Sequence, residues 1–140
     1  MRCSALIVLA FVLAACKSEP AANGSCGTDV EQSIQPGSHT KLRAPVSVAD
    51  GLEVIISDVF IPAGAEVPRH YHPGEEFLYV IAGSAVHVEE GKPDRLLSAG
   101  DAYVIPPEAI HAPYGGPNGG RAVVFRVHVS GKEERYLVPE

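Results

Sequence analysis

Two histidines lie one residue apart in the segment "RHYHPGEEFLYVIAGS", which covers residues 69–84. His70 and His72 are followed by Glu76, and the apolar residues after Glu76 are typical of a β-strand. Side chains alternate between the two faces of a strand, so all three residues would point the same way. Imidazole and carboxylate groups are suitable ligands for a divalent metal ion. The alternative for this pattern alone is a pair of surface or hydrogen-bonded histidines.

A metal site of this kind requires a ligand from elsewhere, and His111 is the best candidate. It ends the segment "GDAYVIPPEAIH" (100–111), which predicts a turn, a short strand and a Pro-Pro bend. A bend of that kind can direct a side chain back into a barrel. Glu75 competes with Glu76 as the carboxylate ligand, but alternation places it on the opposite face, where we expect a solvated side chain.

The elements that must position these residues are short strands. We expect them at residues 52–61, 75–82, 84–90, 95–98, 102–106 and 121–129. Turn signals recur about every ten residues, which is typical of a sandwich or barrel, and Gly83 between two of the strands predicts a hairpin. The expected apolar interior consists of Val54, Ile56, Leu78, Val80, Val104 and Val123.

For several other polar residues the sequence must be used to predict whether the side chain faces the interior or the solvent. A two-residue turn before His87 would direct it inward, whereas the valines beside it indicate the opposite face, so its orientation stays open. His128 shares a face with Arg126 and is expected to be exposed. The segment "YGGPNGG" (114–120) is either a lid at the barrel mouth or an ordinary turn, and Tyr114 within it is either a ligand contact or a packing residue.

The N-terminal residues 1–15 have the pattern of a secretory signal. An apolar run too short to span a bilayer ends in "LAAC" (13–16), which resembles the bacterial lipobox. We expect lipidation of Cys16, and the alternative is an ordinary cleaved signal in which this cysteine is incidental. Lys17 follows, with no aspartate to indicate inner-membrane retention, so we expect an outer-membrane anchor facing the periplasm if the host is Gram-negative.

A flexible tether is expected at residues 16–38, which are small, polar and without apolar period. The remaining residues, 39–140, are of a length that suits one domain. The formal net charge of −6 and the lack of a basic patch argue against nucleic acid as a partner. Cys26 alone would remain as a free thiol after processing, so no disulfide framework is expected, and membrane contact is expected through the lipid anchor only.

The chain resembles a small single-domain cupin. The first motif of that family is G-x5-H-x-H-x3,4-E-x6-G, and its fixed positions are met by Gly64, His70, His72, Glu76 and Gly83. The second motif is G-x5-P-x-G-x2-H-x3-N, and it is met by Gly100, Pro106 and His111, with Glu108 in place of the glycine and Gly115 in place of the asparagine. These two departures concern the geometry of loops and not the ligands.

The resemblance implies an all-β, single jelly-roll barrel, also called a double-stranded β-helix. It implies His70, His72, Glu76 and His111 as ligands of one divalent transition metal, for which Fe, Mn, Ni, Zn and Cu are all admissible. The implied activity is that of a dioxygenase, isomerase, decarboxylase or lyase acting on a small polar molecule in the cell envelope. A non-catalytic, envelope-tethered protein that binds a metal or small ligand is the alternative, and a homodimer stays open.

Overall fold

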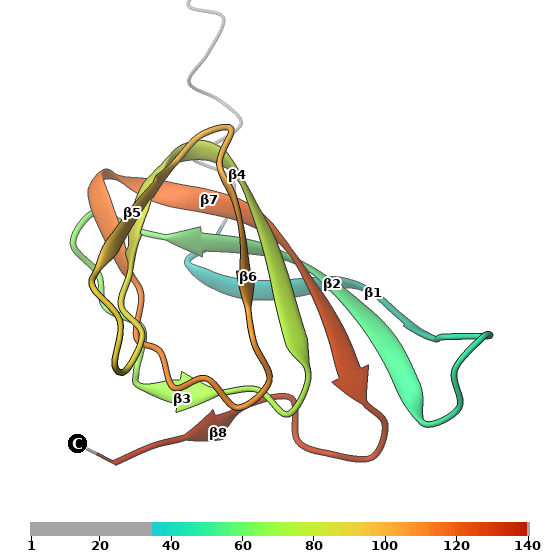
Figure 1. Cartoon of the computed structure of the whole chain (residues 1–140). Coiled ribbons are helices and arrows are strands. Elements are labelled where there is room, and N and C mark those ends of the chain that lie inside the picture. Colours follow the sequence, from blue (N-terminus) through green and yellow to red (C-terminus); the bar gives the residue numbers. More distant parts are fainter. Residues whose placement is uncertain (1–34, 140) are drawn as a thin grey trace, which may run out of the picture.

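The computed structural model describes residues 35–139, which form strands and no helix (Figure 1). The strands are β1 (Gly37–Pro45), β2 (Leu52–Ile61), β3 (His70–Tyr71), β4 (Glu75–His87), β5 (Arg95–Ser98), β6 (Ala102–Ile105), β7 (Tyr114–Val129) and β8 (Tyr136–Leu137). Within these residues no helix is long and apolar enough to cross a membrane. The expected signal, Cys16 and most of the expected tether lie outside the described residues.

Six strands form one curved antiparallel sheet in the order β1-β2-β7-β4-β5, with β6 paired to β4. The other two strands, β3 and β8, pair with each other and lie across one side of the barrel, close to the C-terminal end (Figure 1). Isolated bridges from His70 and from Glu89 to His111 join the small sheet to the rest of the barrel. The predicted all-β jelly roll is confirmed.

The long strand β4 is continuous, so the predicted hairpin at Gly83 is wrong. Its first half pairs with β6 and its second half with β5, and its register with β7 shifts on both sides of Gly83. Gly83 has a φ of 64°, and a Cβ added there would lie 2.1 Å from the carbonyl oxygen of Gly119. The glycine therefore marks a bulge that bends the strand without reversing it.

The glycine-rich segment at residues 114–120 belongs to β7 and pairs with β4, so both the lid and the ordinary turn are wrong. Gly115 pairs with Ala85, and an added Cβ at Gly116 would lie 2.1 Å from Ser84 Oγ. These glycines allow close approach between strands, which a longer side chain would prevent. Tyr114 pairs with Val86 in the sheet.

The edge strand β1 begins at Gly37, which pairs with Phe60 of β2. It therefore includes the last two residues of the segment expected to be tether. The domain boundary between residues 38 and 39 itself stays a prediction.

The buried apolar core contains Ile55, Val80, Leu97, Ile105 and Val124. The expected core position Val104 is 44% exposed, and its neighbour Ile105 takes the interior place. Apolar residues occupy both faces of β2 and β6, so the sequence pattern could not determine which face is buried.

Arg126 and His128 are buried, with exposures of 6% and 1%, so the prediction that His128 is exposed is wrong. They lie on the inner face of β7, and Phe125 on the outer face is 44% exposed. The more polar face of β7 points inward because carboxylates there, among them Glu76, pair with Arg126.

Candidate metal centre

His70 and His72 reach the barrel interior from the short strand β3 and the residue that follows it. Both are 4% exposed, as the alternation of side chains predicts. Tyr71 between them points the other way and stacks on Tyr136 of β8, with a distance of 5.1 Å between the ring centroids. The small sheet thus fixes the orientation of this histidine pair.

His111 joins the pair because its backbone forms an antiparallel bridge with His70, with N–H···O distances of 2.9 and 3.0 Å. The predicted bend before it lies at Pro106, Pro107 and Glu108. Glu108 has a φ of 60°, and its N–H donates to the carbonyl of His72 at 2.8 Å. This left-handed conformation is the one that favours the glycine of the cupin motif, so the loop keeps its geometry despite the departure in sequence.

All three imidazoles are held by the same kind of hydrogen bond. Nδ1 donates to the carbonyl oxygen of Pro68 in His70, of Glu134 in His72 and of Ala109 in His111, at 2.7, 2.6 and 2.9 Å. A carbonyl can only accept, so Nδ1 carries the proton and Nε2 keeps a free lone pair. This is the arrangement by which proteins orient metal-binding histidines.

The free ring nitrogens converge. One potential ligand atom from each of His70, His72 and His111 lies within 4.8 Å of the others. Nε2 of His72 is buried and has no hydrogen-bond partner. A buried acceptor without a donor is costly, and a metal ion at the centre of the cluster would satisfy it.

Glu76 faces the same cluster from β4, and its Oε2 lies 3.2 Å from Nε2 of His72. This contact is no hydrogen bond, because the ring proton of His72 is on Nδ1 and the carboxylate has none. The same Oε2 accepts a hydrogen bond from Nε of Arg126 at 2.6 Å. Burial raises the pKa of Glu76, but the charge and hydrogen bond of Arg126, together with the electrostatic interactions with His72 and His111, more than offset it, so the pKa lies below the usual value and the carboxylate is ionised.

The pKa values keep the histidines neutral and able to bind a metal. Burial lowers the pKa of His70 to about 3, and the charge of His111 adds to this effect. Burial also lowers the pKa of His72 to about 4 and shifts that of His111 downward.

Two spaces adjoin the cluster. A cavity of about 70 Å³ has mostly apolar walls, with Glu76, His87 and His111 among the polar residues that line it. A wider groove of about 770 Å³ borders all four predicted ligands together with Arg126 and Glu134. The cluster therefore has an apolar space on one side and an accessible, charged groove on the other.

His87 is buried and lines the small cavity, which answers the question that the sequence left open. Its Nε2 lies 3.1 Å from Oε2 of Glu89, and its ring centroid lies 5.6 Å from that of His111. The hydroxyl of Tyr103 reaches the same carboxylate oxygen at 3.5 Å, and Lys92 contacts the other oxygen at 2.6 Å. A second polar cluster thus lies beside the metal centre.

The sequence reasoning missed Glu89, Arg126 and Glu134. Arg126 interrupts the apolar strand "RAVVFRVHV", and a charge in such a strand is a signal that could have indicated a buried partner. Glu134 lies in a charged turn without any periodic pattern. Glu75 is exposed, in agreement with its expected solvated position.

A family model described as Cupin domain matches residues 57–130, more than half of the chain. The chain belongs to the cupin family. This cupin is 43% identical over 54 residues to dimethylsulfoniopropionate lyase DddQ of Ruegeria pomeroyi, a stretch that is 39% of the chain and 27% of that relative. The crystal structure of the lyase matches with a TM-score of 0.53 and 30% identity, over 64% of this cupin and 44% of the lyase.

The chain therefore spans less than half the length of the lyase that it matches. A cupin-like protein from Thermotoga maritima matches with a TM-score of 0.55 and 23% identity, over 77% of the chain and 89% of that protein. Oxalate decarboxylase from Bacillus subtilis matches with a TM-score of 0.55 and 18% identity, over 75% of the chain and 29% of the enzyme. These two likenesses show the fold.

Proposed function

We propose that this cupin is a metalloenzyme that acts on a small polar molecule in the cell envelope. The observation that carries the proposal is the common orientation of the three imidazoles, each with Nδ1 bound to a carbonyl and Nε2 left free. His70, His72 and His111 would hold the ion, with Glu76 as the carboxylate ligand. A bound divalent ion would supply Lewis-acid polarisation of a substrate oxygen.

Among the reaction classes that the cupin motif admits, a lyase reaction is favoured. Its support is the 43% identity to dimethylsulfoniopropionate lyase over 54 residues. A substrate of that kind carries a carboxylate on a short chain. Dioxygenase, isomerase and decarboxylase activities are the alternatives, and the experiment below distinguishes them from a lyase activity by the substrate that is consumed.

The groove offers a binding partner for such a carboxylate. Arg135 lines the groove, is exposed, and forms no ion pair with another described residue. Arg135 precedes Tyr136, which pairs with Tyr71 in the small sheet, and it lines the same groove as His72. The apolar walls of the small cavity would hold the uncharged part of the substrate.

The location in the envelope rests on the "LAAC" ending alone. Mass spectrometry of the membrane fraction should show an acylated Cys16 as the N-terminus, and an unmodified N-terminus elsewhere would exclude the anchor.

The test of the activity uses purified protein loaded separately with Fe(II), Mn(II), Ni(II), Zn(II) and Cu(II). Each form is incubated with dimethylsulfoniopropionate and with a panel of other short carboxylates, and consumption is followed by ¹H NMR. We expect metal-dependent consumption that is lost in His72→Ala and reduced in Arg135→Ala, with Lys132→Ala as the matched control for an exposed positive charge. Binding of the metal without turnover of any substrate would favour the non-catalytic alternative.

A further inference from the structure

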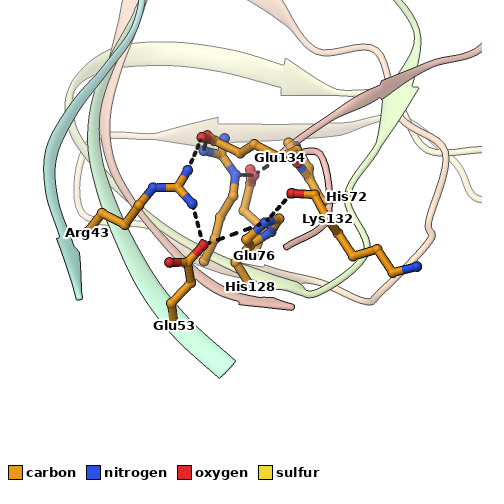
Figure 2. Close-up of polar contacts among 8 residues, drawn as sticks. Arg43, Glu53, His72, Glu76, His128, Lys132 and Glu134 are labelled. Carbon is orange, nitrogen blue, oxygen red and sulfur yellow. Dashed lines mark hydrogen bonds and ion pairs between the residues drawn. The ribbon is translucent and has the colours of Figure 1, made fainter. Parts of the chain in front are cut away.

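In the turn between β7 and β8, residues 130–135, Glu134 forms hydrogen bonds to the residues of the metal centre. The backbone carbonyl of Glu134 accepts a hydrogen bond from His72, and its side chain accepts one from Arg43 (Figure 2). The side chain also accepts a hydrogen bond from Arg126. We propose that Glu134 is a positioning residue of the metal centre, which holds two of the four predicted ligands from outside the cluster. This inference rests on the proposed metal site and adds to it a residue that no motif indicates.

The first ligand held in this way is His72. Its Nδ1 donates to the carbonyl oxygen of Glu134 at 2.6 Å, across 62 residues of chain. That bond fixes both the rotation of the ring and the tautomer that leaves Nε2 free. Displacement of the turn would therefore turn the ring of His72 away from the cluster.

The second ligand is Glu76, which Glu134 reaches through Arg126. Arg126 donates from Nε to Oε2 of Glu76 at 2.6 Å and from Nη1 to Oε1 of Glu134 at 2.7 Å. Arg126 is 6% exposed, and its bond to Glu76 is buried, whereas its bond to Glu134 is partly buried. Because Glu76 and Glu134 accept hydrogen bonds from different nitrogens of Arg126, the plane of the guanidinium is fixed. The fixed guanidinium in turn fixes the orientation of the Glu76 carboxylate.

The turn is itself attached to the sheet. Arg43 of the edge strand β1 donates to Oε2 of Glu134 at 3.0 Å and also pairs with Glu53 of β2. Next to them, Nε2 of His128 contacts the carbonyl of Lys132 in the turn at 3.2 Å (Figure 2). The turn is thus attached to strands β1 and β7. From this position it orients His72 directly and Glu76 through Arg126.

The test compares Glu134→Ala and Glu134→Gln with Glu133→Ala as the matched control. Glu133 is exposed, and its contact with Tyr136 uses the backbone N–H, which the substitution keeps. Two readouts are taken: exchange of the His72 Nδ1–H with solvent in the metal-free protein by NMR, and Zn²⁺ affinity by competition with a chelator. Thermal melting of each variant establishes that it is folded.

We expect Glu134→Ala to weaken Zn²⁺ binding by about 10- to 100-fold and to accelerate exchange of the His72 ring proton. Glu134→Gln keeps an acceptor oxygen for Arg126 and should be intermediate, and Glu133→Ala should resemble the wild type. In an Arg126→Ala background, Glu134→Ala should cost less affinity, because the path to Glu76 is already lost.

If both readouts in the folded Glu134 variants equal those of Glu133→Ala, the positioning role is wrong. If the wild type binds no metal, the proposed function fails, and the ring-proton exchange still decides the role of Glu134. If Glu134→Ala does not fold, the decision passes to Glu134→Gln.

Discussion

His70, His72 and His111 each direct one free nitrogen toward a common centre, and this geometry depends on individual hydrogen bonds of Nδ1. Their types and spacing predicted that the three side chains would lie together, and the structure confirms that they do. The hydrogen bonds that select the tautomer were not predictable, because the accepting carbonyls come from residues without any side-chain signal.

Metal should remain bound well below the ordinary histidine pKa of about 6.5. A proton competes with the ion only where it binds the same Nε2, and burial lowers the pKa of His70 to about 3 and that of His72 to about 4. We therefore expect Zn²⁺-loaded protein dialysed at about pH 5.5 to retain its metal, as measured by elemental analysis. Release of half the metal at about pH 6.5 would contradict these lowered pKa values.

Glu108→Gly should stabilise the protein. Glu108 is exposed and has a φ of 60°, a conformation that costs a residue with a Cβ about 1 kcal/mol. We expect the free energy of unfolding to rise by up to about 1 kcal/mol in denaturant titrations. Glu108→Ala keeps the Cβ and is the control; an equal gain in both variants would show that the backbone conformation is not the cause.

At the scale of the elements, β4 illustrates what a local pattern can and cannot predict. The residues of β2 and β5 were predicted with the bounds that the structure has, because turn signals flank them on both sides. Gly83 gives the same local signal for a turn and for a bulge, and only the pairing of β4 with both β5 and β6 distinguishes the two.

Gly83→Ala should destabilise the fold more than Gly91→Ala. Both glycines have positive φ, of 64° and 77°, but a Cβ at Gly83 would overlap the carbonyl oxygen of Gly119, whereas the space at Gly91 is open. We expect losses of about 3 kcal/mol or more for Gly83→Ala and about 1 kcal/mol for Gly91→Ala. Equal losses in thermal or denaturant unfolding would show that only the backbone angle matters.

The inner face of β7 was assigned wrongly because both faces of this strand carry large apolar residues. Burial of Arg126 depends on Glu76, which is 50 residues away, and on Glu134 in the following turn. Ion pairs between residues so far apart in the sequence form only in the folded protein, and no periodic pattern of the sequence predicts them. The motif residues that the resemblance implies as ligands lie together in the structure, while the charged network around them appeared only there.

For the whole molecule, the fold class and the family were predictable from the two motifs and the recurring strands. Residues 35–139 form a barrel with its own buried core of Ile55, Val80 and other apolar residues. A chain that begins at Gln35 should therefore fold and bind metal as the mature protein does. Comparison of their melting temperatures and Zn²⁺ affinities tests this, and a chain from Gln35 that fails to fold would show that earlier residues belong to the domain.

The central claim is that three histidines and Glu76 form a metal site, and metal content tests it most directly. Wild-type protein, His72→Ala, His111→Ala and the exposed control Glu75→Gln are purified under aerobic and anaerobic conditions and measured by elemental analysis. We predict about one transition-metal ion per chain in the wild type and in Glu75→Gln, and little or none in the two histidine variants. A wild type without metal, or full metal in both histidine variants, would contradict the account.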